Sequence, residues 1–105
     1  MLRHMVLFSL KDTIEDADRD YILGQAARLA DIASVRRLDV ARLLDPADPA
    51  YKTHIATDFD YALLIDFDDE AGLYAYQKDP FHVVFAKEIR ERVSGLKVMD
   101  FVTSR

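Results

Sequence analysis

The sequence predicts an α+β fold in the order β-α-β-β-α-α-β, with a four-stranded antiparallel sheet and helices on one of its faces. The first observation is that segments with strand-like alternation of apolar side chains are separated by segments in which apolar residues recur every three or four positions. The second is the dipeptide Asp79-Pro80, which splits the later helical region into two helices. The length of 105 residues predicts a single domain spanning 1–105.

The first half of the chain begins with a predicted strand over 2–10, which has apolar side chains on both alternating faces. A strand of this kind must be covered on both sides. Thr13 followed by Asp16 is typical of a capping box, and the apolar spacing after it predicts a helix over 14–33. A second strand is predicted over 35–44, where apolar residues mix with charged ones.

A polar connection over 45–60 follows, with two Asp-Pro dipeptides, Asp45-Pro46 and Asp48-Pro49. Connections in compact domains are usually about 4–6 residues long, so this one is unusually long. Long loops of this kind are often functional. The segment is therefore predicted to be either a lid or an arm that contacts a partner.

The third strand is predicted over 61–67, where apolar side chains alternate with small or acidic ones. Asp68 and Asp69 can cap a short helix that runs to about Tyr76. Asp79 is a good N-cap for the helix after it, because the proline that follows suits the first helical position.

The helix that begins at Pro80 is predicted to close at Ser94-Gly95, and a fourth strand follows over 96–102. One set of helices covers only one face of the sheet. The apolar strand residues on the other face need a second sheet, and a twofold-related copy of the chain is the simplest source. The sequence therefore predicts a homodimer.

Composition excludes several classes of function. The chain has no cysteine, so disulfides, thiolate chemistry and cysteine zinc sites are ruled out, which fits a cytoplasmic protein. The net charge of -5 disfavours binding to nucleic acid or to an anionic membrane, since both need clustered basic residues. The apolar start over 2–10 is too short to span a bilayer. Histidines at positions 4, 54 and 82 lack the spacing of a metal-ligand pair, so no metal is predicted.

The strongest functional signal is the pair Tyr76 and His82, which flank the predicted helix break. His82 falls in the opening turn of a helix, where the helix dipole disfavours imidazolium and lowers the pKa. A neutral imidazole beside a phenol can accept a proton while the phenol stabilises an oxyanion. A structural interpretation stands beside this one, because a lone histidine on the apolar stripe of a helix is often a packed core residue. Tyr76 can likewise be an amphipathic rim residue.

Three segments together resemble the stress-responsive dimeric α+β barrel (Dabb) family, and the resemblance covers nearly the whole chain. They are Arg3-His4-Met5-Val6-Leu7-Phe8, Asp60-Tyr61-Ala62-Leu63-Leu64-Ile65-Asp66-Phe67 and the spacing Tyr76-x-x-Asp79-Pro80-x-His82-x-x-Phe85. The chain departs from the family pattern at Asp79, where the family frequently has histidine, and in the loop 45–60. The resemblance implies a ferredoxin-like homodimer whose two sheets pack face to face, with a pocket between sheet and helices in each subunit.

The resemblance also implies roles for individual residues. In the olivetolic acid cyclase type of this family, a linear tetraketide thioester is folded by aldol condensation. The histidine of the Pro-x-His motif is the base there and the tyrosine six residues earlier assists, which implies these roles for His82 and Tyr76. The histidine early in the first strand contributes to the pocket and matches His4. The remaining predicted substrate-binding residues are Val6, Phe8, Tyr61, Val84 and Phe85.

The sequence therefore predicts a cofactor-independent enzyme of cyclase or lyase type, acting on a β-keto or aromatic intermediate of secondary metabolism. His82 would remove a proton from a carbon flanked by carbonyls, and Tyr76 would donate a hydrogen bond to the enolate. The alternative is a non-catalytic or stress-associated protein that holds a small apolar or aromatic ligand in the same cavity. A pure assembly module is a third interpretation, which gives no reason for His82 to face a cavity.

Overall fold

The computed structural model describes residues 1–104 and has the predicted ferredoxin-like α+β fold. Every predicted strand and long helix is present, in the predicted order. The elements are β1 Leu2–Leu10, α1 Asp16–Arg28, a 3₁₀ turn η1 Leu29–Asp31, β2 Arg37–Arg42, α2 Pro49–Lys52, β3 Tyr61–Phe67, α3 Glu70–Lys78, α4 Pro80–Arg90 and β4 Val93–Val102.

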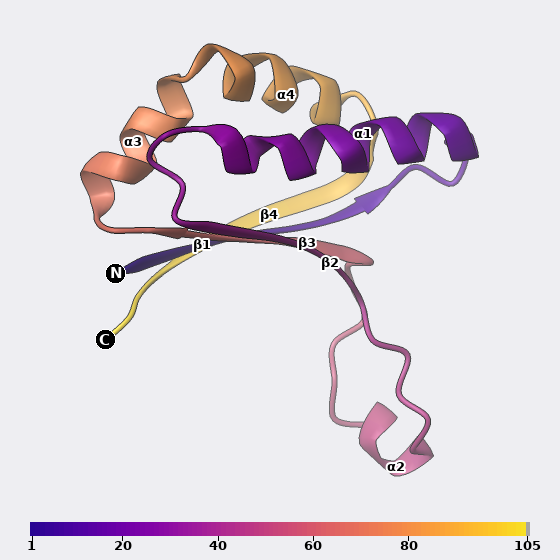
Figure 1. Ribbon diagram of the computed structural model, residues 1–105. Coiled ribbons are helices and arrows are strands. Elements are labelled where there is room, and N and C mark those ends of the chain that lie inside the picture. The colour runs from indigo at the N-terminus through magenta and orange to yellow at the C-terminus, as the bar shows by residue number, and fades with distance from the viewer. Residues whose placement is uncertain (105) are drawn as a thin grey trace.

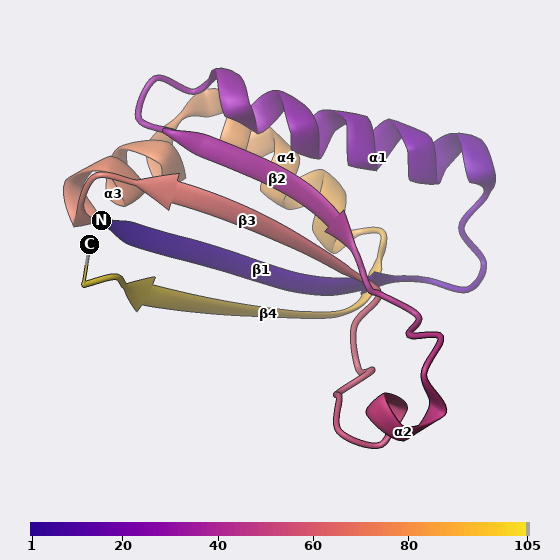
Figure 2. The ribbon, with the colours of Figure 1, turned by 60° about the horizontal axis from the view of Figure 1, so that its bottom comes forward.

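The four strands form one antiparallel sheet in the order β2-β3-β1-β4 (Figure 2). β1 lies inside the sheet between β3 and β4, and its even-numbered residues are buried. The two chain termini lie at the same end of the sheet (Figures 1 and 2). β2 and β4 are the two edge strands of this sheet.

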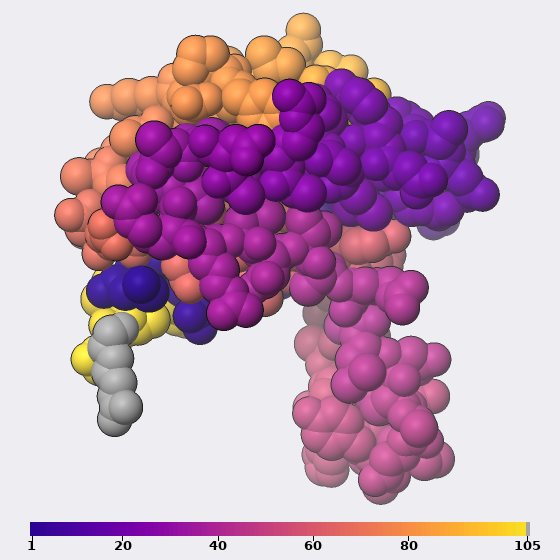
Figure 3. All heavy atoms as spheres, viewed as in Figure 1, coloured from indigo at the N-terminus to yellow at the C-terminus, as the bar shows by residue number. Residues whose placement is uncertain are grey.

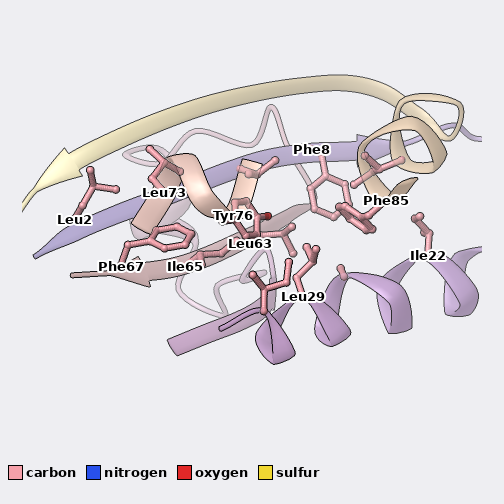
Figure 4. Packing of buried hydrophobic residues seen from close by; sticks show 14 of the residues in the cluster. Leu2, Phe8, Ile22, Leu29, Leu63, Ile65, Phe67, Leu73, Tyr76 and Phe85 are labelled. Carbon is pink, nitrogen blue, oxygen red and sulfur yellow. The ribbon is translucent and has the colours of Figure 1, made fainter. Parts of the chain in front are cut away.

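Helices α1, α3 and α4 all lie on one face of the sheet (Figure 1). The core fills the space between these layers and combines side chains from β1 and β3 with the inner stripes of the helices (Figure 4). Its fully buried large side chains are Tyr76, Phe8, Phe67, Ile22, Leu29, Leu63 and Ile65. Burying one such apolar side chain contributes about 1.5–3 kcal/mol, so this layer is the main source of stability.

The predicted helix break between α3 and α4 is confirmed. The Asp79 side chain accepts a hydrogen bond from the backbone N–H of Phe81 at 2.8 Å, and Pro80 occupies the first turn of α4. Asp79 is also the C-cap of α3. At the other end of α3, Asp69 accepts from the N–H of Gly72 at 3.0 Å, as its capping role predicts. One residue therefore joins the two helices with no linker.

The predicted bounds of the first helix are wrong at both ends. α1 is capped by Glu15, which makes no side-chain capping bond, so Thr13 is not part of a capping box. The reason is a turn in which the N–H of Ile14 bonds to the carbonyl of Lys11 at 3.0 Å, placing Thr13 before the helix. The helix also stops short of residue 33, because the chain tightens into η1 and becomes extended at Ile32.

The helix end predicted at Ser94-Gly95 is also wrong. α4 ends four residues earlier with Glu91 as a right-handed C-cap, and the chain passes almost directly into β4. Gly95 lies in that strand opposite Ser9. No residue in the described range 1–104 has a positive φ, so no glycine acts as a left-handed cap there. The predicted strand 35–44 is also too long, because β2 spans only Arg37–Arg42.

Residues 43–60, here called the arm, connect β2 to β3 and contain the short helix α2, which the sequence did not predict. The Asp48 side chain caps α2 by accepting from the N–H of Ala50 at 3.0 Å. The arm projects from the side of the sheet opposite the helices and stands away from the body (Figures 1 and 3). Its exposed apolar side chains include Leu44 and Tyr51.

The face of the sheet that the helices leave uncovered is here called the open face (Figure 1). Met5 lies at its centre, opposite Leu64 on β3 and Met99 on β4. The apolar residues that share this face are Met5, Leu7, Ala62, Leu64, Met99 and Phe101. Met99 is 48% exposed and Phe101 46% exposed, although both are large apolar side chains. The prediction that one set of helices leaves an apolar sheet face uncovered is confirmed.

One stability prediction follows from α1. Gly24 is exposed in the middle of this helix, and a Cβ atom added there would meet no atom within 4 Å. Gly24→Ala is therefore expected to raise the free energy of unfolding by about 1 kcal/mol, because alanine restricts the unfolded chain without a clash. Urea unfolding at fixed protein concentration measures it. Ala27→Gly, at another exposed position of α1, should lower stability similarly, and equal stabilities of all three proteins would contradict the argument.

Candidate functional site

A cavity of about 350 Å³ lies between helices α3 and α4 and the β1–β4 side of the sheet. Most of its wall is apolar. Its polar lining comes from both ends of α4, from α3 and from the facing strands. The lining residues are His4, Val6, Leu63, Leu73, Tyr74, Tyr76, Gln77, His82, Phe85, Ala86, Ile89, Arg90, Leu96, Val98 and Asp100. An apolar cavity with a few convergent polar groups is the usual form of a small-molecule site.

Tyr76 and His82 meet at this cavity. Their ring centroids are 4.4 Å apart and the rings are inclined by 50°. Tyr76 is only 1% exposed and packs edge-on against Phe67, whereas His82 is half-buried. Because Asp79 ends one helix and caps the next, the turn that it makes brings the last full turn of α3 against the first turn of α4.

The hydrogen bonding of His82 leaves one ring nitrogen available. Its Nδ1 lies 3.2 Å from the backbone carbonyl oxygen of Gln77. A carbonyl only accepts, so Nδ1 carries the proton in this bond and the neutral ring has its lone pair on Nε2. Burial lowers the pKa of His82. The hydrogen bond to Gln77 opposes this effect, whereas His4 and Arg90 lower the pKa further and Asp79 raises it. His82 is therefore a neutral imidazole at pH 7.

The pKa of the Tyr76 phenol is shifted in the opposite direction to that of His82. Burial raises its pKa well above the ordinary value of 10.0, so the hydroxyl stays protonated. Within residues 1–104 this hydroxyl has no hydrogen-bond partner, and it belongs to the cavity wall. It is thus a donor available to a bound molecule, next to an available base.

A second histidine completes a row of aromatic rings. His4 packs edge-on against Tyr76, with ring centroids 6.0 Å apart, and is 4% exposed. Its Nδ1 lies 2.5 Å from a carboxylate oxygen of Asp100, its partner across the β1–β4 pairing. This contact holds the ring in one orientation against the phenol. His4, Tyr76 and His82 therefore line one side of the cavity in sequence.

The structure brings together five of the eight predicted site residues and places three elsewhere. The five at the cavity are His4, Val6, Tyr76, His82 and Phe85. Phe8 is fully buried and stacks on Tyr61, with centroids 5.4 Å apart. Tyr61 instead lines a separate hollow formed mostly by residues of the arm. Val84 is 56% exposed on the outer side of α4, because the helical period carries it away from the stripe of Phe85 and Ile89.

Sequence reasoning missed several cavity residues. Leu96, Val98 and Asp100 alternate along β4 and share the face that looks toward the helices, which is a period-two signal readable in the sequence. Ala86 and Arg90 follow His82 at intervals of four along α4, which is also readable. The contact of Asp100 with His4 could not be read, since it joins residues 96 apart.

The sequence matches the family model of the stress responsive A/B barrel domain, Dabb, over residues 2–103. The chain belongs to this family. Solved structures of similar fold include a Dabb-family protein with a ferredoxin-like fold from Mesorhizobium loti. It is 24% identical with a TM-score of 0.79, and the match covers 97% of this Dabb chain and 95% of that one. No curated protein matches the sequence.

Two further structures of the same fold are described as enzymes. The hydroxynitrile lyase from Passiflora edulis is 22% identical with a TM-score of 0.81, and the match covers 99% of this Dabb protein and 94% of the lyase. SnoaB from Streptomyces nogalater, a cofactor-independent oxygenase, is 14% identical with a TM-score of 0.72, over 99% and 93% of the two chains. At these identities the likeness establishes the fold alone.

The part of the chain that the structure describes contains no group of three histidine, cysteine or acidic side chains placed to hold a metal ion. The third histidine, His54, is exposed on the arm, away from the other two. None of the helices within residues 1–104 is long and apolar enough to cross a membrane.

Proposed function

We propose that this Dabb protein is a small-molecule enzyme that removes a proton from an activated carbon without a cofactor, in cyclase- or lyase-type chemistry on a β-keto or aromatic intermediate of secondary metabolism. The observation that carries the proposal is the pairing of an unshared Nε2 on His82 with an unpaired hydroxyl on Tyr76 in one apolar cavity. A base and an oxyanion donor are the two groups that enolate formation needs.

The proposed step uses each group once. His82 Nε2 takes the proton from a carbon flanked by two carbonyls, and the C–H electron pair moves onto a carbonyl oxygen as an enolate. Tyr76 donates its hydroxyl hydrogen bond to that oxygen. The enolate carbon then attacks a second carbonyl of the same molecule, forming a carbon–carbon bond, and the imidazolium of His82 returns the proton to the new alkoxide. This is an intramolecular aldol closure.

The surroundings favour this step. The Gln77 carbonyl accepts from Nδ1 of His82 and stabilises the ring when it becomes cationic. His4, oriented by Asp100, holds the phenol ring from its other side. The apolar walls contributed by Val6 and Phe85 limit the water that could compete for the enolate.

We also propose that the protein acts as a homodimer through the open face. The related structures from Thermobifida fusca and Bacteroides fragilis are described as dimeric proteins with this fold. The uncovered apolar patch around Met5 needs a partner, and a second copy supplies a matching sheet. The arm projects on the same side as this face, so exposed Leu44 and Tyr51 can reach the second subunit (Figure 1).

A non-catalytic binding protein is the second candidate, because the mostly apolar cavity would also hold a ligand without reacting with it. The two functions differ in one observable. An enzyme of the proposed type exchanges the acidic carbon-bound hydrogens of its substrate with solvent, whereas a binding protein only shifts its own melting temperature.

Proton exchange therefore tests the proposal. The protein is incubated in deuterated water with a panel of 1,3-diketones, β-keto thioesters and aryl ketones, and loss of the C–H signal is followed by NMR. We expect exchange above background, slowed about 10- to 100-fold by Tyr76→Phe, which removes one hydrogen bond to a charged oxygen and keeps the ring. Tyr21→Phe is the matched control, since that hydroxyl donates to Glu88 and does not line the cavity. Binding without exchange across the panel would favour the binding protein.

A further inference from the structure

Arg90, the last residue of α4, lines the cavity and has no partner of its own in the described chain. Five other arginines form ion pairs with carboxylates, namely Arg3, Arg19, Arg36, Arg37 and Arg92. Arg90 makes no ion pair or hydrogen bond within residues 1–104, and it is an exposed residue that lines the mostly apolar cavity. A guanidinium in that position has its full set of donors free for a bound molecule.

Arg90 shares one helical face with His82. The residues His82, Ala86 and Arg90 are spaced four apart on α4, and all three line the cavity. Helical side chains lean toward the N-terminus, and the small Ala86 leaves room for the guanidinium to lean toward the imidazole. The charge of Arg90 is close enough to help lower the pKa of His82. Eight residues of helix separate the two backbone positions by about 12 Å.

The other charge at the cavity is already engaged. Asp100 contacts His4 at 2.5 Å. It also acts on Tyr74, whose pKa is raised by Glu70, by burial and, least of all, by the charge of Asp100. Asp100 and Arg90 therefore lie on different elements, β4 and the end of α4. The apolar residues Leu96 and Val98 precede Asp100 on the cavity face of β4. Arg90 is therefore the charged lining residue that has neither an ion pair nor a hydrogen bond within residues 1–104.

We propose that Arg90 binds the carboxylate of an amphipathic ligand, whose apolar body lies along the column His82–Ala86–Arg90 and whose far end reaches His82. This inference rests on the proposed function for the statement that the far end carries the reacting carbon, and it narrows the substrate class to keto or aryl carboxylic acids. A monoanion fits better than a phosphate dianion. The site offers one guanidinium at a helix C-terminus, where the helix dipole opposes concentrated negative charge.

Paired ligands test this inference without any turnover. Straight-chain and phenylalkyl carboxylates of about four to ten carbons are titrated against the 105-residue chain by calorimetry. Each is compared with its neutral amide, which has the same apolar body. We expect at least one carboxylate to bind about 10- to 100-fold more tightly than its amide, the value of one charge-assisted interaction. In Arg90→Gln this preference should vanish while the amide binds as before.

Lys87→Gln is the matched control, since Lys87 is a cation in the same last turn of α4 but does not line the cavity. It should keep the carboxylate preference. The inference is overturned if no carboxylate in the series binds better than its amide, or if Arg90→Gln retains the preference. The proposed function would fail differently, through absence of carbon–proton exchange in a protein that still selects carboxylates.

Discussion

Replacing His82 with asparagine is expected to slow carbon–proton exchange by about 10²- to 10⁴-fold, the range for loss of a general base. The asparagine amide N–H can take the place of Nδ1 and still donate to the Gln77 carbonyl, so the local contact survives. What disappears is Nε2, the only ring nitrogen with a free lone pair. The rate with the best ketone of the exchange panel measures the effect.

The melting temperature of the same variant separates chemistry from structure. His82 is half-buried and borders a cavity, so His82→Asn should leave the melting temperature nearly unchanged. A structural histidine would behave in the reverse way, because losing it would destabilise the fold by about 1–3 kcal/mol. A variant that unfolds early yet retains exchange in its folded fraction would end the assignment of His82 as the base.

The pH dependence of exchange tests the same assignment. Since the folded pKa of His82 lies below its ordinary value of 6.5, the acidic midpoint of the exchange rate should fall below pH 6.5. The unfolded chain binds that proton more readily than the folded one. The contribution of His82 to stability is therefore complete above pH 6.5 and is lost as the pH falls toward the folded pKa. His82→Asn should lack this acidic limb in the residual rate.

Met5→Glu is expected to convert a dimer into a monomer, with the dissociation constant rising at least about 100-fold. Met5 is at the centre of the open face, between Leu64 and Met99. A carboxylate there would be buried without a partner when two sheets pack together, which costs several kcal/mol, and each 1.4 kcal/mol is tenfold in affinity. Light scattering across a wide range of concentrations measures the shift.

Val84→Glu is the control for this experiment. Val84 is a similarly apolar side chain but lies exposed on the outer side of α4, away from the open face. It should leave the association unchanged. If wild type is a compact monomer of 12.0 kDa at all concentrations, or if Met5→Glu dimerises as wild type does, the open face is not the interface.

The fold was predictable because its signals are local. Strand alternation in 2–10 and 61–67, and the Asp79-Pro80 break, each follow from a few neighbouring side chains. The errors occurred where tertiary context prevails over local preference. Gly95 was predicted to end a helix, but it pairs with Ser9 of β1 and is therefore part of β4. Thr13 has the sequence signature of a helix cap, but it lies in the turn between β1 and α1, which the Ile14–Lys11 backbone hydrogen bond closes.

The candidate site divides in the same way. Tyr76 and His82 are six positions apart, so their encounter could be inferred from the break between them. Val84 was misplaced because its apolar character alone does not say which side of α4 it faces. Asp100 could not have been found, since its position opposite His4 depends on the register of two strands from opposite ends of the chain.

The two contacts of the site, one between residues close in sequence and one between residues far apart, differ in when they form and in how easily they are lost. The Tyr76–His82 contact needs only two short helices, so contacts of this range can form early in folding. The His4–Asp100 contact closes a separation of 96 residues and depends on β4, an edge strand whose last residue, Val102, is 83% exposed. Fraying of that strand would release His4 and open one wall of the cavity while the phenol and imidazole stay in place. Local opening of β4 would then lower the fraction of molecules with an intact cavity, and hydrogen exchange in β4 would report this opening before any global unfolding.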